Sequence, residues 1–401
     1  MNKLIRAAGM LSLGTASLAV QTFVCAADDG KSWNISAALR GFYDDNIYTR
    51  PNGPDKLDSF GFEISPSIKY RIATDDTTVR FSYTYSAKYY DGRPQGTDKW
   101  DQSHIIDAAL KHSFSPRVSL DLSDRFAVAQ EPEQLGLGGT EFRANGNNKS
   151  NRANIAGTIG LTSQFGLVIG YGNNFYDYDD IRYASSLNRM EHNPSVDLTY
   201  QLKPATVLVA GYAYSIVDFD TVTPNRDNQS HFIRAGVDQK FSDQLTASAR
   251  VGAQIVNYEL PGQKDITSPY ADLSLKYAFT PDASLSVGVS HKHNATDVIQ
   301  AEDQESTAVY GVFAYKFTAN LSGKLIAQYQ NSEFISSDPN LNGRTEDYYS
   351  FGLNLAYMIN SNISLDASYY YDKLESDNSV ALLAPRSFSR NRVFLGVRFS
   401  Y

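Results

Sequence analysis

The segment KYAFTPDASLSVGVS, from Lys276 to Ser290, contains the pattern that decides the fold. Apolar and polar residues alternate up to Phe279, a short hinge with Pro281 and Asp282 follows, and a second alternation comes after it. Successive side chains of a strand point to opposite faces, so each alternation predicts a strand with one apolar face. Because Pro and Asp favour tight turns, the segment predicts a hairpin of two antiparallel strands.

The same hinge recurs at intervals of roughly 40 residues along the chain. Eight short hinges alternate strictly with nine longer connections, and this arrangement predicts 18 strands. The other seven hinges lie in YRIATDDTTVRFSY, KHSFSPRVSLDL, GLTSQFGLVIGY, YQLKPATVLVAG, QKFSDQLTASAR, YKFTANLSGKLI and AYMINSNISLDA.

An even strand number with alternating short and long connections is typical of outer-membrane barrels. We therefore predict an all-β protein, a single closed antiparallel transmembrane β-barrel of about 18 strands, with short periplasmic turns and long extracellular loops. A closed barrel is the sheet that meets lipid without exposing an edge. A soluble sandwich is the alternative, but it would be expected to divide into domains of about 100 residues.

The first 26 residues differ from the rest of the chain. Lys3 and Arg6 precede an apolar stretch, and small residues end it at Ala26. This pattern predicts a cleaved secretory signal peptide over 1–26 and a barrel over 27–401. Cys25 is the only cysteine, so we expect no disulfide in the mature chain.

The two faces of each predicted strand differ in charge. In RVFLGVRFSY, the apolar residues Leu395, Val397 and Phe399 alternate with Arg392 and Arg398. We assign the apolar face to lipid and the polar face to the lumen. The predicted pore-lining candidates are Arg80, Lys88, Arg125, Arg234, Arg250, Lys276, Arg390, Arg392 and Arg398. The acids predicted on that face are fewer: Glu63, Asp107, Asp121, Asp197, Asp238, Asp272 and Asp366.

The predicted lumen is therefore basic, although the whole chain carries 44 acidic and 36 basic residues. The alternative for the lysines closest to the short turns is that they extend to the membrane interface. An acidic chain argues against nucleic acid as a partner.

Aromatic residues gather at both ends of the predicted strands. Two girdles at the membrane interfaces would give this distribution, because amphipathic rings favour that depth. The residues assigned to the girdle beside the long loops are Tyr89, Tyr90, Tyr176, Tyr178, Tyr258, Phe334, Tyr370 and Tyr371. At the other end, Phe399 and Tyr401 close the chain in a pattern that resembles the C-terminal signal read by barrel-assembly machinery.

The sequence shows no catalytic constellation, so we expect a protein that is not an enzyme and holds no cofactor. His291 and His293 share one strand face, but two ligands are too few for a closed metal site, and we expect none. The expected partners are outer-membrane lipid, barrel-assembly machinery, and small solutes or polysaccharide; a homo-oligomer stays open.

The segment GFYDDNIYTRPNGPDKLDSFGFEISPSIKYRI, residues 41–72, resembles the opening of the family called putative β-barrel porin 2. The similarity rests on Asp44–Ile47 after the first strand and on Ser65–Pro66 inside the second. The resemblance implies a barrel in the outer membrane of a Gram-negative-type bacterium, in a family often associated with exopolysaccharide systems.

Three functional hypotheses follow. The first is a porin-like channel for passive passage of small hydrophilic solutes, with anions favoured by the basic lumen. The second is a barrel that serves exopolysaccharide export or surface attachment. The third is a structural barrel whose lumen is plugged by an inward fold of the loop at 131–150.

Overall fold

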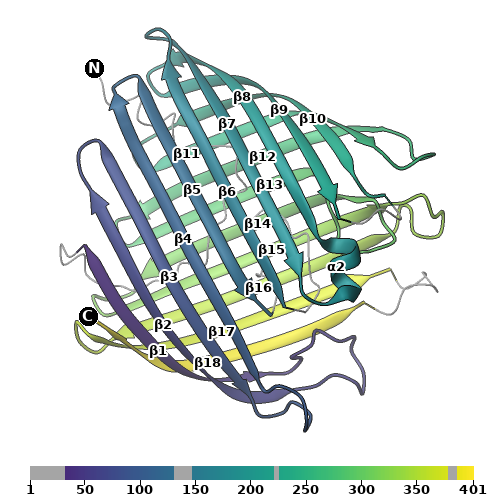
Figure 1. Cartoon of the computed structure of the whole chain (residues 1–401). Coiled ribbons are helices and arrows are strands. Elements are labelled where there is room, and N and C mark those ends of the chain that lie inside the picture. Colours follow the sequence, from purple (N-terminus) through teal and green to yellow (C-terminus); the bar gives the residue numbers. More distant parts are fainter. Residues whose placement is uncertain (1–31, 131–146, 221–224, 378–385) are drawn as a thin grey trace.

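The chain forms one closed 18-stranded antiparallel barrel, as predicted (Figure 1). The computed structural model describes residues 32–130, 147–220, 225–377 and 386–401. The predicted signal peptide lies outside these residues. The strands are β1 (Trp33–Asp44), β2 (Ser59–Ala73), β3 (Thr77–Tyr90), β4 (Trp100–Ser115), β5 (Val118–Ala129), β6 (Asn148–Gly160), β7 (Phe165–Tyr178), β8 (Arg189–Lys203), β9 (Thr206–Phe219), β10 (Asn228–Lys240), β11 (Leu245–Tyr258), β12 (Ile266–Thr280), β13 (Ala283–Asn294), β14 (Asp303–Lys316), β15 (Leu321–Ile335), β16 (Thr345–Met358), β17 (Ile363–Ser376) and β18 (Phe388–Ser400).

Each strand pairs with its neighbours in sequence, and the first strand pairs with the last. The β1–β18 ladder runs from Ser36 opposite Ser400 to Asp44 opposite Arg392. Tyr401 extends it through a backbone hydrogen bond from its N–H to the Ile35 carbonyl, at 2.8 Å. The barrel therefore closes on its own chain ends and leaves no open edge.

The short and long connections lie at opposite rims. Figure 1 shows the C-terminus at the rim of the short turns and helix α2 (Ile181–Leu187) at the rim of the long loops. No helix in the described part of the chain is long and apolar enough to cross a membrane.

The predicted alternation of faces is observed on β18. Leu395 is 62% exposed on the outer surface, whereas Arg392 and Arg398 are buried on the inner one. Phe81 of β3 also lies on the outer surface, opposite Ala108 of β4. Period-two alternation therefore placed the side chains correctly on both strands.

The Ser65–Pro66 segment interrupts one ladder. The β2–β3 pairing is continuous up to Ile64 and resumes at Ser67. Pro66 has no backbone N–H to donate, so it is tolerated here only because the ladder is irregular. The opposite edge of β2 stays paired, with Pro66 opposite Ala37 of β1.

The prediction that the aromatic residues beside the long loops form a girdle at the membrane interface is wrong for most of them. Tyr90, Tyr176, Tyr178 and Phe334 are almost fully buried inside the barrel instead of facing lipid. They pack against inward-folded loops, which need an apolar surface to bury their own side chains. Tyr89 does lie outside, stacked on Phe62.

Candidate functional site

The nine basic residues predicted to line the pore occupy inward-facing positions on six strands. Along each strand they alternate with the outward apolar residues. Paired residues on neighbouring strands lie on the same face, so the registers confirm the inward positions across the sheet. They are Arg80 and Lys88 of β3, Arg125 of β5, Arg234 of β10, Arg250 of β11, Lys276 of β12, and Arg390, Arg392 and Arg398 of β18.

One of these arginines is held by a carboxylate two strands away. Arg234 of β10 donates from Nη2 to Asp197 Oδ1 of β8 at 2.7 Å, although β9 lies between the two strands. Gly211 of β9 is paired with both residues. A Cβ at Gly211 would come within 1.7 Å of the Asp197 carboxylate, so the ion pair requires glycine there.

Further inward arginines also have acidic partners. Arg250 donates to Asp238 at 2.9 Å, and Arg392 donates to Asp372 at 2.6 Å. The sequence placed Asp238 on the inward face, but it gave no indication of either pairing. These pairs reduce the net charge that the wall presents to a solute.

Two inward cations have no such partner. Within the described residues, neither Lys69 of β2 nor Arg398 of β18 makes a hydrogen bond or an ion pair. Arg40 of β1 lies on the strand between them, and its Nε is 3.7 Å from Glu63 Oε2 and 3.6 Å from Asp366 Oδ2.

Lys88 of β3 lies on the same side of the barrel, with its Nζ 5.8 Å from the centroid of the Phe394 ring. We call Arg40, Lys69, Lys88 and Arg398 the basic strip. Its members outnumber the two acids beside it, Glu63 and Asp366, so this part of the wall carries net positive charge.

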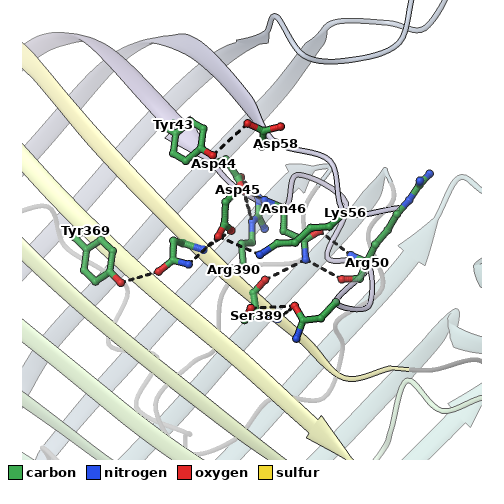
Figure 2. A network of polar contacts seen from close by, with 12 residues as sticks. Tyr43, Asp44, Asp45, Asn46, Arg50, Lys56, Asp58, Tyr369, Ser389 and Arg390 are labelled. Carbon is green, nitrogen blue, oxygen red and sulfur yellow. Dashed lines mark hydrogen bonds and ion pairs between the residues drawn. The ribbon is translucent and has the colours of Figure 1, made fainter. Parts of the chain in front are cut away.

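The Asp44–Ile47 segment forms a network of polar contacts at the seam between β1 and β18 (Figure 2). Asp44 pairs with Arg390 and also accepts a hydrogen bond from the Asn46 N–H at 2.9 Å. Asn46 donates through Nδ2 to the carbonyls of Arg50 and Ser389, at 2.8 and 3.1 Å. This amide therefore joins the β1–β2 loop, residues 45–58, to β18.

Asp45 makes a second set of contacts at this seam. It accepts hydrogen bonds from the Asn391 N–H at 2.7 Å and from Lys56 Nζ at 3.1 Å. Burial alone would raise the pKa of the Asp45 carboxyl. The hydrogen bonds from Asn391 and Lys56 outweigh burial and hold the pKa below its ordinary value. Asp45 therefore stays charged at neutral pH.

This network directs the β1–β2 loop inward, toward the barrel mouth. Ile47 is only 1% exposed and packs in a cluster with Phe42, Tyr90 and Phe394, which are inward-facing residues of three strands. The loop is thereby fixed both by polar contacts at the seam and by apolar packing on the inner wall.

The β13–β14 loop, residues 295–302, fills another part of the mouth. Its Ala295 packs with Leu187 of α2, while Val298 packs with Phe334 and Leu341. The loop thus reaches the connection between β7 and β8 on one side and the β15–β16 region on another. Contacts to strands so far apart in the barrel order place the loop across the mouth.

Two arginines from other loops hold the β13–β14 loop. Arg226 donates to the carbonyls of Ser186 and Thr296, both at 2.8 Å. Arg386 donates to Asp297 at 2.9 Å and to Glu346 at 2.7 Å. Burial alone would lower the pKa of Arg386, but these two carboxylates outweigh it and raise the pKa.

The long loop at 131–150, predicted as the candidate plug, is described only from residue 147, where β6 is about to begin. The inward folds that the structure does describe belong to the β1–β2 and β13–β14 loops. Neither fold was predicted from the sequence. The only signal is weak: both connections contain apolar residues, such as Ile47 and Val298, which the structure buries.

His291 and His293 lie on one face of β13, as predicted. His291 Nε2 is 3.1 Å from Glu305 Oε1, and His293 Nδ1 is 2.9 Å from Asp303 Oδ2. Within the described residues, no group of three or more His, Cys, Asp or Glu side chains has the geometry to hold a metal ion.

The closed barrel and its charged lumen define an outer-membrane protein of the porin class. The family model described as putative beta-barrel porin 2 matches residues 34–401, and the chain belongs to this family. The similarity predicted from Asp44–Ile47 and Ser65–Pro66 is thus confirmed. The protein is an outer-membrane β-barrel of a Gram-negative bacterium.

Several solved outer-membrane proteins match this chain at low sequence identity. Acinetobacter baumannii OccAB3 is 14% identical with a TM-score of 0.44, over 92% of this chain and 99% of that chain. OpdK from Pseudomonas aeruginosa is 9% identical with a TM-score of 0.47, over 92% and 99%. A BenF-like porin from Pseudomonas fluorescens Pf-5 is 13% identical with a TM-score of 0.46, over the same shares. The comparison with curated proteins gave no match.

Proposed function

We propose that the protein is a passive channel that favours small hydrophilic anions, and that the basic strip sets this preference. The observation that carries the proposal is that Lys69 and Arg398 face the lumen without an acidic partner in the described residues. An anion in transit can supply the missing counter-charge. The proposal involves no catalytic step and no cofactor.

The electrostatic argument depends on which charges are already neutralised. An ion pair such as Arg234–Asp197 contributes little net field at a distance, whereas Lys69 and Arg398, which have no ion-pair partner in the described residues, contribute more. A low-dielectric wall focuses that field on ions inside the lumen.

An acidic mouth would oppose this preference by attracting cations. Two acids of the inward-folded loops have basic partners: Asp45 contacts Lys56, and Asp297 contacts Arg386. Asp44, at the end of β1, is paired with Arg390. The pull of the mouth on cations is therefore weakened, and the wall decides the selectivity.

The test is the anion-to-cation permeability ratio of the purified protein in liposomes. The double variant Lys69→Gln with Arg398→Gln should lower the ratio toward one, because it removes two lumenal positive charges that have no ion-pair partner in the described residues. Lys373→Gln is the matched control, since Lys373 lies on the outer face of β17 beside Glu375. An unchanged ratio in the double variant would refute the proposal.

A plugged structural barrel is the second candidate, and the packing of the β13–β14 loop favours it. Arg226 and Arg386 fix this loop across the mouth from two sides. If the loop stays fixed, the wild-type protein should pass neither anions nor cations in the liposome measurement. Ion flux in the wild type would exclude this candidate.

The C-terminal strand supports a further proposal about assembly. Phe399 and Tyr401 are 53% and 71% exposed at the rim of the short turns, on the outer surface. We infer that the barrel-assembly machinery binds these residues before β18 pairs with β1. Replacing both by Ser should reduce the amount of barrel in the membrane, while the purified variant refolds in detergent.

A further inference from the structure

The outer wall carries one carboxylate at an unusual position. Asp124 of β5 lies on the outward face, between Leu122 and Phe126 along its own strand. It is paired with Ala108 of β4 and Ala153 of β6. A charged residue with apolar outward neighbours on both sides lies within the lipid-facing band.

Aromatic residues on the neighbouring strand fix the depth of Asp124. Its partner Ala108 lies between Phe114 and Trp100, two outward residues that are 64% and 38% exposed near the ends of β4. At roughly 3.3 Å per residue and a tilt of about 40°, Asp124 lies about 15 Å from the level of Phe114. That depth is near the middle of the hydrocarbon layer.

Other outward carboxylates of the described strands lie close to the rim of the long loops. At that depth their side chains can reach the water at the membrane surface. They are Asp177, Asp218, Glu305, Glu333, Asp347 and Glu375.

Polar residues continue around Asp124 on the neighbouring strands. Asn151 of β6 donates from Nδ2 to Asp124 Oδ1 at 2.8 Å. The row that starts at Asp124 continues through Ala153 to Asn173 of β7 and then to His192 of β8. Lipid chains offer no hydrogen bonds to these groups, so this part of the wall is poorly matched to hydrocarbon.

Small and apolar residues complete the surface. Ala108 and Ala153 are short, and no atom lies within 4 Å of the Cβ position of outward Gly157. Ile155 and Ile169 beside them are 42% and 51% exposed. A second protein could therefore approach the backbone closely and bury both apolar and polar groups.

We propose that the surface formed by Ala108, Asp124, Asn151, Ala153, Asn173 and His192 is the contact surface for a second copy of this chain. We call it the Asp124 face. Its occupant must span the same membrane at the same depth and offer hydrogen-bond donors to a carboxylate. The Asp124 face itself supplies an acceptor in Asp124 and a donor in the Nε2–H of His192, whose Nδ1 accepts from the Tyr171 hydroxyl at 2.7 Å, so two copies are chemically complementary.

A photocrosslinking amino acid at position 153 tests the occupant in native outer membranes. The matched control is the same residue at Ala367, an outward position on β17 between Leu355 and Leu395. We expect an ultraviolet-dependent product of twice the chain mass, made only of this chain, from position 153 and none from 367. Crosslinks to lipid only, or to a different protein, would overturn the proposal.

Variants at Asp124 provide a second test. Asp124→Leu matches lipid better and should still fold, as shown by heat-modifiable migration, while losing most of the crosslinked product. Asp124→Asn keeps a polar group at this depth and should retain more product than Asp124→Leu. Equal yields in the wild type and both variants would show that the carboxylate does not contribute to an interface.

Discussion

At the scale of single residues, Asn46 explains why the β1–β2 loop enters the barrel. Its amide bonds the Arg50 and Ser389 carbonyls, and its Oδ1 accepts a hydrogen bond from the Arg50 N–H at 2.9 Å. The side chain is fully buried, so water cannot replace these partners. One residue thus satisfies three backbone groups from two segments that are far apart in sequence.

Asn46→Ala should release the β1–β2 loop and leave the barrel intact. Three hydrogen bonds at about 1 kcal/mol each predict a local loss of about 3 kcal/mol. Hydrogen exchange of residues 44–50 in detergent should accelerate, while exchange of the strands should not change. Asn52→Ala is the control, since Asn52 belongs to the same loop but its side chain bonds only Ser389, in contacts that lie at the surface. Equal exchange in both variants would contradict this role.

Leu395 tests the assignment of faces at a single position. Leu395→Arg should destabilise the barrel by about 2–4 kcal/mol, because it places a charge against the hydrocarbon layer. Leu395→Ala keeps an apolar side chain and should cost less. Urea titration of the refolded barrel measures both. Wild-type stability of Leu395→Arg would show that this position does not face lipid.

The sequence predicted which face a residue occupies but not which residue it contacts. Alternation alone assigns Arg234 to the lumen, because the strand period is two. The partner Asp197 lies two strands away and is accessible only across Gly211. Similarly, alternation cannot distinguish an aromatic residue under a loop from one in a girdle. Tyr90 and Tyr176 were therefore predicted on the wrong side of the wall.

At the scale of elements, the two inward-folded loops restrict the mouth. The β1–β2 loop is fixed on β18, and the β13–β14 loop contacts α2, β15 and the β15–β16 loop. Such loops have no hydrophobic period, so the sequence shows their length and turn residues but not their direction. The strands, which are periodic, were predicted in number and pairing.

Arg386→Gln should loosen the β13–β14 loop and increase the mean single-channel conductance or its fluctuation. The change removes the charge that joins Asp297 to Glu346. Arg344→Gln is the control, because Arg344 pairs with exposed Asp377 and does not contact the β13–β14 loop. Conductance traces that are the same in the wild type and Arg386→Gln would show that this tether does not limit the path.

At the scale of the whole molecule, the closed barrel follows from the number and order of its hairpins. Eight short turns and nine long connections fix 18 strands, and backbone hydrogen bonds between β1 and β18 close the sheet. The distribution of charge is also a property of the whole wall. Paired arginines occur in several places, whereas the basic strip on β18, β1, β2 and β3 keeps a net positive charge.

The most direct test of the account is the reversal potential of the wild-type protein in a planar bilayer with a potassium chloride gradient. The account predicts stable conductance and a reversal potential with the sign set by chloride, because the basic strip carries net positive charge. A reversal potential with the sign set by potassium, or a protein that inserts and does not conduct, would contradict it.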